Sequence, residues 1–73
     1  MPKNEYFIEF MYFNDGTVTA IIMPRGKAEG KGYYDRYSKR FNGYDLYVDG
    51  FKTYAEALKN KVESLNYSNK GVA

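Results

Sequence analysis

Aromatic and β-branched residues dominate the first third of the chain and predict two strands. The apolar runs EYFIEFMYF and TVTAIIM are separated by Asn-Asp-Gly, which predicts a β-hairpin over about residues 5–23. A two-residue loop would pair Phe10 with Ile21, whereas a three-residue loop with a glycine bulge would pair Phe10 with Ala20. We favour the bulge because it sets apolar residues opposite one another, but the register stays open by one residue.

A second hairpin is expected over about residues 33–50, where Asn-Gly separates YYDRYSKRF from YDLYVDG. Asn-Gly favours a two-residue type I′ turn, since both residues tolerate a positive φ. This loop places Arg40 opposite Asp45 and Arg36 opposite Asp49, as ion pairs across the strands. The other side of the hairpin is then mostly apolar and consists of Tyr37, Phe41, Tyr44, Leu46 and Val48, with Lys39 as the exception.

The last third of the chain predicts one helix over about residues 54–66. Thr53 precedes it as a cap, and Glu56 follows three residues later, which is the pattern of a capping box. Apolar residues recur on one side of this helix at Tyr54, Leu58, Val62 and Leu65. Residues 67–73 are polar and contain glycine, and we expect a frayed tail there.

These elements predict an α+β fold, in which a four-stranded antiparallel sheet from two hairpins packs one face on a C-terminal helix. Residues 1–73 are expected to form a single small domain, because a chain of this length supports one hydrophobic core. Residues 24–32, PRGKAEGKG, contain three glycines and a proline without apolar periodicity, so they are expected to form a flexible basic loop.

The composition argues against an enzyme. The chain has no histidine and no cysteine, so the commonest general base and the usual transition-metal ligands are missing, and neither a metal nor another cofactor is expected. Asp45 and Asp49 share a strand face, but four residues of strand separate them by roughly 13 Å. Paired glycosidase carboxylates lie at most about 9.5 Å apart. No catalytic residues are therefore assigned.

The first strand carries large apolar residues on both of its faces, whereas one helix can cover only one face of the sheet. The uncovered face would present an aromatic patch, of the kind that marks interfaces. We therefore expect a protein-binding module, such as a small regulator or inhibitor of phage type, with another protein or a second copy of the chain as partner. The predicted contact residues are Phe7, Met11, Phe13 and Tyr47. The alternative is that residues 24–32 or the tail fold over this face.

A nucleic-acid-binding domain is the second hypothesis for function. The net charge is only +2, but its whole excess lies within residues 24–32. Cations there could contact phosphates, while neighbouring tyrosines could stack on bases. The predicted contact residues are Arg25, Lys27, Lys31, Tyr33 and Tyr34.

Residues 50–58, GFKTYAEAL, resemble the strand-to-helix junction of AP2-like domains, including the arm-type DNA-binding domains of phage integrases. The resemblance covers about nine residues and consists mostly of the capping box. It implies a three-stranded sheet that reads DNA with its open face. The Asn42-Gly43 hairpin and the paired arginines depart from that pattern.

The N-terminal sequence MPKNEYFIEF has no charged segment followed by a long apolar run, and no stretch approaches the roughly 18 apolar residues of a membrane span. We therefore expect a cytoplasmic protein without a membrane partner.

Overall fold

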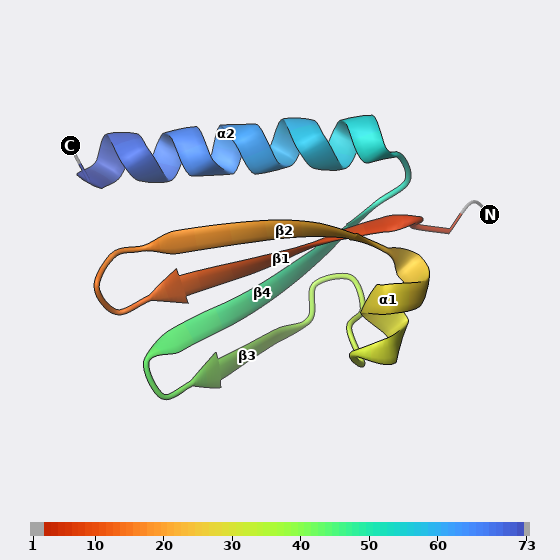
Figure 1. Cartoon of the computed structure of the whole chain (residues 1–73), viewed down its shortest axis with the longest axis horizontal. Helices are drawn as coiled ribbons and strands as arrows, with labels where there is room; N and C mark the ends of the chain where they lie inside the picture. The colour runs from red at the N-terminus through yellow and green to blue at the C-terminus, as the bar shows by residue number, and fades with distance from the viewer. Residues whose placement is uncertain (1–2, 73) are drawn as a thin grey trace.

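The computed structural model describes residues 3–72, with side chains described as far as residue 66, and it has an α+β fold (Figure 1). Four antiparallel strands form one sheet in the order β2-β1-β4-β3, as predicted from two hairpins. The elements in chain order are β1 (Tyr6–Phe13), β2 (Val18–Pro24), α1 (Arg25–Gly30), β3 (Ser38–Phe41), β4 (Tyr44–Phe51) and α2 (Tyr54–Val72).

The first hairpin adopts the bulged register favoured from the sequence. Phe10 pairs with Ala20. Gly16 has a φ of 91°, which a residue with a side chain rarely adopts, and this glycine supplies the bulge. Asp15 holds the turn, since its Oδ1 accepts a hydrogen bond of 2.8 Å from the backbone N–H of Thr17. The loop sequence therefore fixes which β2 residues face each side of the sheet.

The predicted pairing of the second hairpin is confirmed next to the turn, but farther from the turn the observed structure differs from the prediction. Arg40 lies opposite Asp45, as expected. Gly43 has a φ of 105°, but Asn42 has no positive φ, so the predicted type I′ turn is wrong. β3 begins only at Ser38, and Arg36 has a φ of 65°, so Arg36 is not the ladder partner of Asp49.

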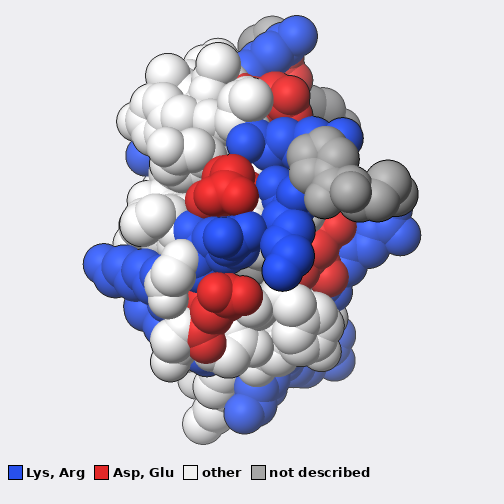
Figure 2. Space-filling model, turned by 90° about the vertical axis from the view of Figure 1, so that its right-hand side faces the viewer, with Lys and Arg blue, Asp and Glu red and all other residues white. Residues whose placement is uncertain are grey.

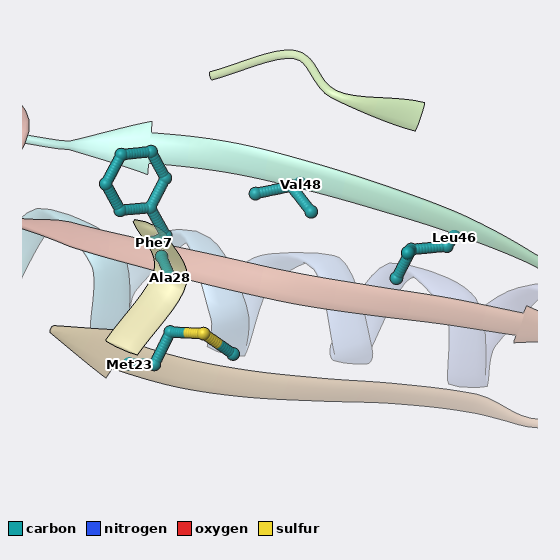
Figure 3. Packing of buried hydrophobic residues seen from close by; sticks show 5 residues of the cluster. All are labelled: Phe7, Met23, Ala28, Leu46 and Val48. Carbon is teal, nitrogen blue, oxygen red and sulfur yellow. The ribbon is translucent and has the colours of Figure 1, made fainter. Parts of the chain in front are cut away.

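Both faces of β1 are covered near its N-terminal end, which makes the molecule three layers thick. On the α2 face, so named for the helix that packs there, the core comprises Ile8, Phe10, Ala20 and Ala57. On the opposite face, called the α1 face, it comprises Phe7, Met23, Ala28, Leu46 and Val48 (Figure 3). Figure 3 looks onto the α1 face, with α2 running behind β1 and β2.

The sequence predicted a flexible loop over residues 24–32, but residues 25–30 form the helix α1. Pro24 starts this helix, where its missing N–H is not needed. Ala28 is completely buried, and its small side chain lets α1 lie close against Phe7 and Met23. Burial of this alanine explains why a glycine-rich segment has a defined place on the sheet.

α2 begins at the predicted cap, since the backbone N–H of Glu56 donates a 3.2 Å hydrogen bond to the Thr53 hydroxyl. It continues to Val72, so residues 67–72, expected as a frayed tail, extend the helix, and Ala73 lies outside the described residues. The apolar stripe is only partly buried. Ala57 is fully buried and Leu65 is half-buried, whereas Tyr54, Leu58 and Val62 are exposed.

Candidate functional site: a groove between α2 and β4

A groove of about 800 Å³ lies on the α2 face, where the sheet extends beyond the helix. Phe10 and Tyr12 contribute from β1, Tyr47 from β4, and Ser64 from α2. The groove exists because α2 packs over the β1–β2 half of the sheet and leaves the β4–β3 half open on this side. We call it the α2–β4 groove; its charged lining residues are Arg36, Asp45 and Asp49.

Two tyrosines form the exposed aromatic part of the α2–β4 groove. Tyr12 and Tyr47 project from neighbouring strands, and their ring centroids lie 5.5 Å apart in an edge-to-face arrangement at 80°. Their exposed fractions are 39% and 44%. Phe10 is buried on the same face, directly opposite Tyr47 in the register, and its ring centroid lies 6.4 Å from that of Tyr12. The pair is therefore held in place by the sheet while its outer surface faces solvent.

The rim of the groove carries charges of both signs. Arg40 Nε lies 3.4 Å from Asp45 Oδ1, which confirms the ion pair expected across the second hairpin. Partial burial and the neighbouring Asp35 raise the pKa of the Asp49 carboxyl above 3.8, while Arg36 acts in the opposite direction. Burial and Asp49 also raise the pKa of the Tyr12 phenol above 10.0, so Tyr12 stays a neutral hydrogen-bonding group.

The residues predicted to bind a protein do not form one patch. Phe7 is only 6% exposed and packs beneath α1, so the expectation of an open aromatic face is wrong at this position. Met11 and Phe13 are half-buried on the same α1 face. Tyr47 lies on the opposite side of the sheet, in the α2–β4 groove. Cover by residues 24–32 was the alternative expectation for this face, and α1 provides that cover.

Two of the three cations predicted to contact nucleic acid are already in ion pairs. Arg25 Nη1 lies 3.0 Å from Glu5 Oε1, and Lys31 Nζ lies 3.7 Å from Glu9 Oε2. Lys27 is exposed on α1. Figure 2 shows acidic side chains interspersed among the basic ones at the end of the molecule that lies on the right of Figure 1.

The two tyrosines predicted to stack on bases have different surroundings. Tyr33 is half-buried and donates a hydrogen bond from its hydroxyl to Glu9 Oε2. Tyr34 is exposed and packs edge to face on Tyr37 at 5.0 Å. Only Tyr34 therefore presents a free ring face of the kind that base stacking needs.

Glu9 is a buried carboxylate that the sequence marked as the sole charge in an apolar strand. It is 3% exposed and receives both the Tyr33 hydroxyl and the Lys31 ammonium. Both partners come from the segment after α1, so they tie that segment to the sheet. This cluster satisfies a charge inside the fold and leaves the carboxylate closed to solvent.

The described residues offer no evident metal site, because residues 3–72 contain no group of three or more potential ligands that could hold an ion. Among the described helices, none is long and apolar enough to cross a membrane. Asp45 and Asp49 line the same groove, but Asp45 is paired with Arg40.

The α2–β4 groove offers the Tyr12 and Tyr47 rings for aromatic contacts, and its polar side chains for hydrogen bonds. These groups can bind and orient the surface of a ligand.

Tyr12 and Arg36 line the groove and were missed as site residues in the sequence. Tyr12 has the same parity in β1 as the buried Ile8 and Phe10, so the alternation of side chains alone would place it in the core. The sequence does show that Tyr12 is the last of these three residues before the turn. It does not show that β4 rather than β3 pairs with β1, and that pairing places Tyr12 beside Tyr47.

Comparison of the chain with protein-family models, with curated protein sequences and with solved structures finds no match.

Proposed function

We propose that this chain is a non-catalytic protein-binding module, a small regulator or inhibitor in its mode of action, that holds another protein in the α2–β4 groove. The observation that carries the proposal is the exposed Tyr12–Tyr47 pair in an open groove of about 800 Å³. Tyrosine combines a large apolar ring with a polar hydroxyl, and it is enriched in the centres of protein interfaces.

The packing of the tyrosine pair supports a binding role. The two ring centroids lie 5.5 Å apart, and the residues belong to paired strands. Side chains that are already ordered lose little conformational entropy when a partner binds. Burying the exposed parts of both rings would then contribute to affinity with little offsetting cost.

The charges around the groove favour a protein over a polyanion. Asp45 and Asp49 lie in the lining itself, and Asp35 lies close enough to raise the pKa of Asp49. These carboxylates would repel phosphates. Together with the positive charges of Arg36 and Arg40, they suit a protein surface that carries charges of both signs. Nucleic acid remains the second hypothesis, and the same experiment separates the two.

The test is capture of a partner from source lysate by the immobilised chain, with and without nuclease, followed by affinity measurement on the purified partner. Tyr47→Ala should weaken binding by about 2 kcal/mol or more, since truncation of a central aromatic often has this effect. The control is Tyr34→Ala, which removes a still more exposed tyrosine ring on another part of the surface and should leave affinity unchanged.

Two results would contradict the proposal. One is a partner that binds Tyr47→Ala and the unmodified chain equally well while Tyr47→Ala keeps the unmodified melting temperature. The other is capture that disappears with nuclease and depends on Lys27, the cation of residues 24–32 that has no ion pair among the described contacts. That second outcome would favour the nucleic-acid hypothesis.

A further inference from the structure

β2 is an edge strand whose outer backbone groups have no partner in the described part of the chain. Phe13 N–H donates to Thr17 O and Arg25 N–H donates to Glu5 O, each at 2.8 Å, so the odd-numbered residues of β2 bond to β1. Hydrogen bonding alternates along an antiparallel strand. The N–H and C=O groups that point outward therefore belong to Val18, Ala20 and Ile22.

The two edges of the sheet differ in how they resist pairing with another strand. β3, at one edge, has only four residues and includes Lys39 and Arg40, and short, charged edge strands discourage association. β2, at the other edge, has seven residues, VTAIIMP, and none is charged. Its only feature that limits pairing is Pro24 at its end. The β2 edge is thus open to strand addition and the β3 edge is blocked.

An exposed apolar stripe of α2 lies on the same side as the β2 edge. Ser64 lines the α2–β4 groove, so its side of the helix points toward β4. At 100° per residue, Leu58 and Val62 lie about 120° and 160° around the helix from Ser64. They therefore occupy the opposite flank, toward β2, where Leu58 is 42% and Val62 48% exposed.

A further apolar side chain extends this surface around the edge strand. Ile21 projects from β2 on the α1 face, opposite Glu9 in the register, and it is 49% exposed. The β2 edge thus has unpaired backbone groups in the middle and exposed aliphatic side chains on both sides. Exposed apolar surface next to an unpaired edge is a combination that associates readily.

We propose that the β2 edge binds a second copy of this chain, with the two β2 strands antiparallel about a two-fold axis at Ala20. In this register Ala20 faces its own copy, and Val18 faces Ile22 of the other protomer. All three residues then use their outward N–H and C=O groups in one continuous eight-stranded sheet. Ile21 lies opposite Thr19 of the other protomer, and the α2 stripes approach each other above the junction.

A second copy fits this edge better than an unrelated strand. A two-fold axis brings like residues together, which is favourable only where the surface lacks charge, and β2 has none. The charged residues nearest the strand are Asp15 at one end and Arg25 at the other. Antiparallel pairing brings these opposite signs together, whereas parallel pairing would oppose like charges. Because the β3 edge is blocked, assembly stops at two chains.

The test is sedimentation of the purified chain over a range of concentrations, with amide hydrogen exchange measured at the same concentrations. A monomer–dimer equilibrium is expected, and the amides of Ala20 and Ile22 should become protected as the dimer forms. Ile21→Lys adds an edge lysine at an exposed position and should raise the dimer dissociation constant by about tenfold or more. Tyr34→Lys, which adds the same charge at a more exposed position away from the β2 edge, is the control.

A chain that stays monomeric at every concentration would overturn the proposal. So would a dimer that Ile21→Lys and Leu58→Lys leave intact, or one in which the Ala20 and Ile22 amides exchange as fast as in the monomer, since each result would place the contact elsewhere. The inference is independent of the proposed function, because the α2–β4 groove lies on the other flank of α2 and Tyr47→Ala should not change dimerisation.

Discussion

Glu9 shows how a single charged residue can organise an otherwise apolar strand. A carboxylate that is 3% exposed needs compensation, because burial of an unpaired charge is strongly unfavourable. Tyr33 and Lys31 supply it, and both follow α1 in the chain. The buried charge therefore selects the arrangement in which this segment folds back onto the sheet, since other arrangements leave Glu9 without partners.

Removing the Tyr33 hydroxyl tests this role of Glu9. Burial and the hydrogen bond to Glu9 raise the pKa of Tyr33 above its ordinary 10.0, so the hydroxyl stays protonated and donates at neutral pH. Tyr33→Phe should lower the free energy of unfolding by about 1–3 kcal/mol, as for a buried group left unsatisfied. Tyr34→Phe is the control, and denaturant unfolding that gives equal losses for both variants would contradict this account.

Asp49 should be destabilising when charged. Its pKa is raised in the folded chain, so the folded state binds the proton more tightly than the unfolded state. The resulting penalty is present above the raised pKa and is gone below the ordinary value of 3.8. Because Asp49 is largely solvated, Asp49→Asn should stabilise the fold at neutral pH by less than about 1 kcal/mol. Thermal melting at neutral pH and near pH 3 should show this gain only at neutral pH.

At the scale of elements, α1 is the least expected feature and has a simple physical basis. A helix of six residues with two glycines has little stability of its own. Its position depends on tertiary contacts, chiefly the burial of Ala28 against Phe7 and Met23. Residues 25–30 contain no apolar repeat from which these contacts could be predicted, because Ala28 is the one buried residue of this helix.

A pair of substitutions within α1 tests this dependence. Ala28→Glu would force a carboxylate into a completely buried position and should lower the free energy of unfolding by about 3 kcal/mol or more. Lys27→Glu introduces the same side chain at the neighbouring exposed position and should change stability by about 0.5 kcal/mol or less. Denaturant unfolding of both variants is the measurement, and similar losses would mean that α1 does not pack as described.

The sequence predicts those elements whose local signals agree with their tertiary contacts. The bulge at Gly16 and the cap at Thr53 are set by side chains within three residues of the feature they control, and both are confirmed. The start of β3 depends instead on Arg36, whose positive φ coincides with hydrogen bonds to β4. The alternation of residues in YYDRYSKRF could not reveal where β3 starts. The positive φ of Arg36 interrupts the strand, and it leaves no trace in the types of residue on either side.

At the scale of the whole molecule, α2 divides its side of the sheet into two surfaces. The groove with Tyr12 and Tyr47 lies toward β4, and the exposed Leu58–Val62 stripe lies toward β2. The sequence predicts that some apolar surface stays uncovered, and Tyr47 is among the contact residues predicted from it. It could not place that surface, because the order β2-β1-β4-β3 depends on long-range pairing for which no local pattern exists.

The central position of β1 also bears on how the chain is made. β1 pairs along its whole length with β4, and that ladder joins Tyr6 to Phe51. During synthesis, β1 therefore cannot pair with β4 until most of the chain has left the ribosome. Until then, the emerging hairpin has an unpaired edge on each strand, and unpaired edges of this kind favour aggregation while a chain is still incomplete.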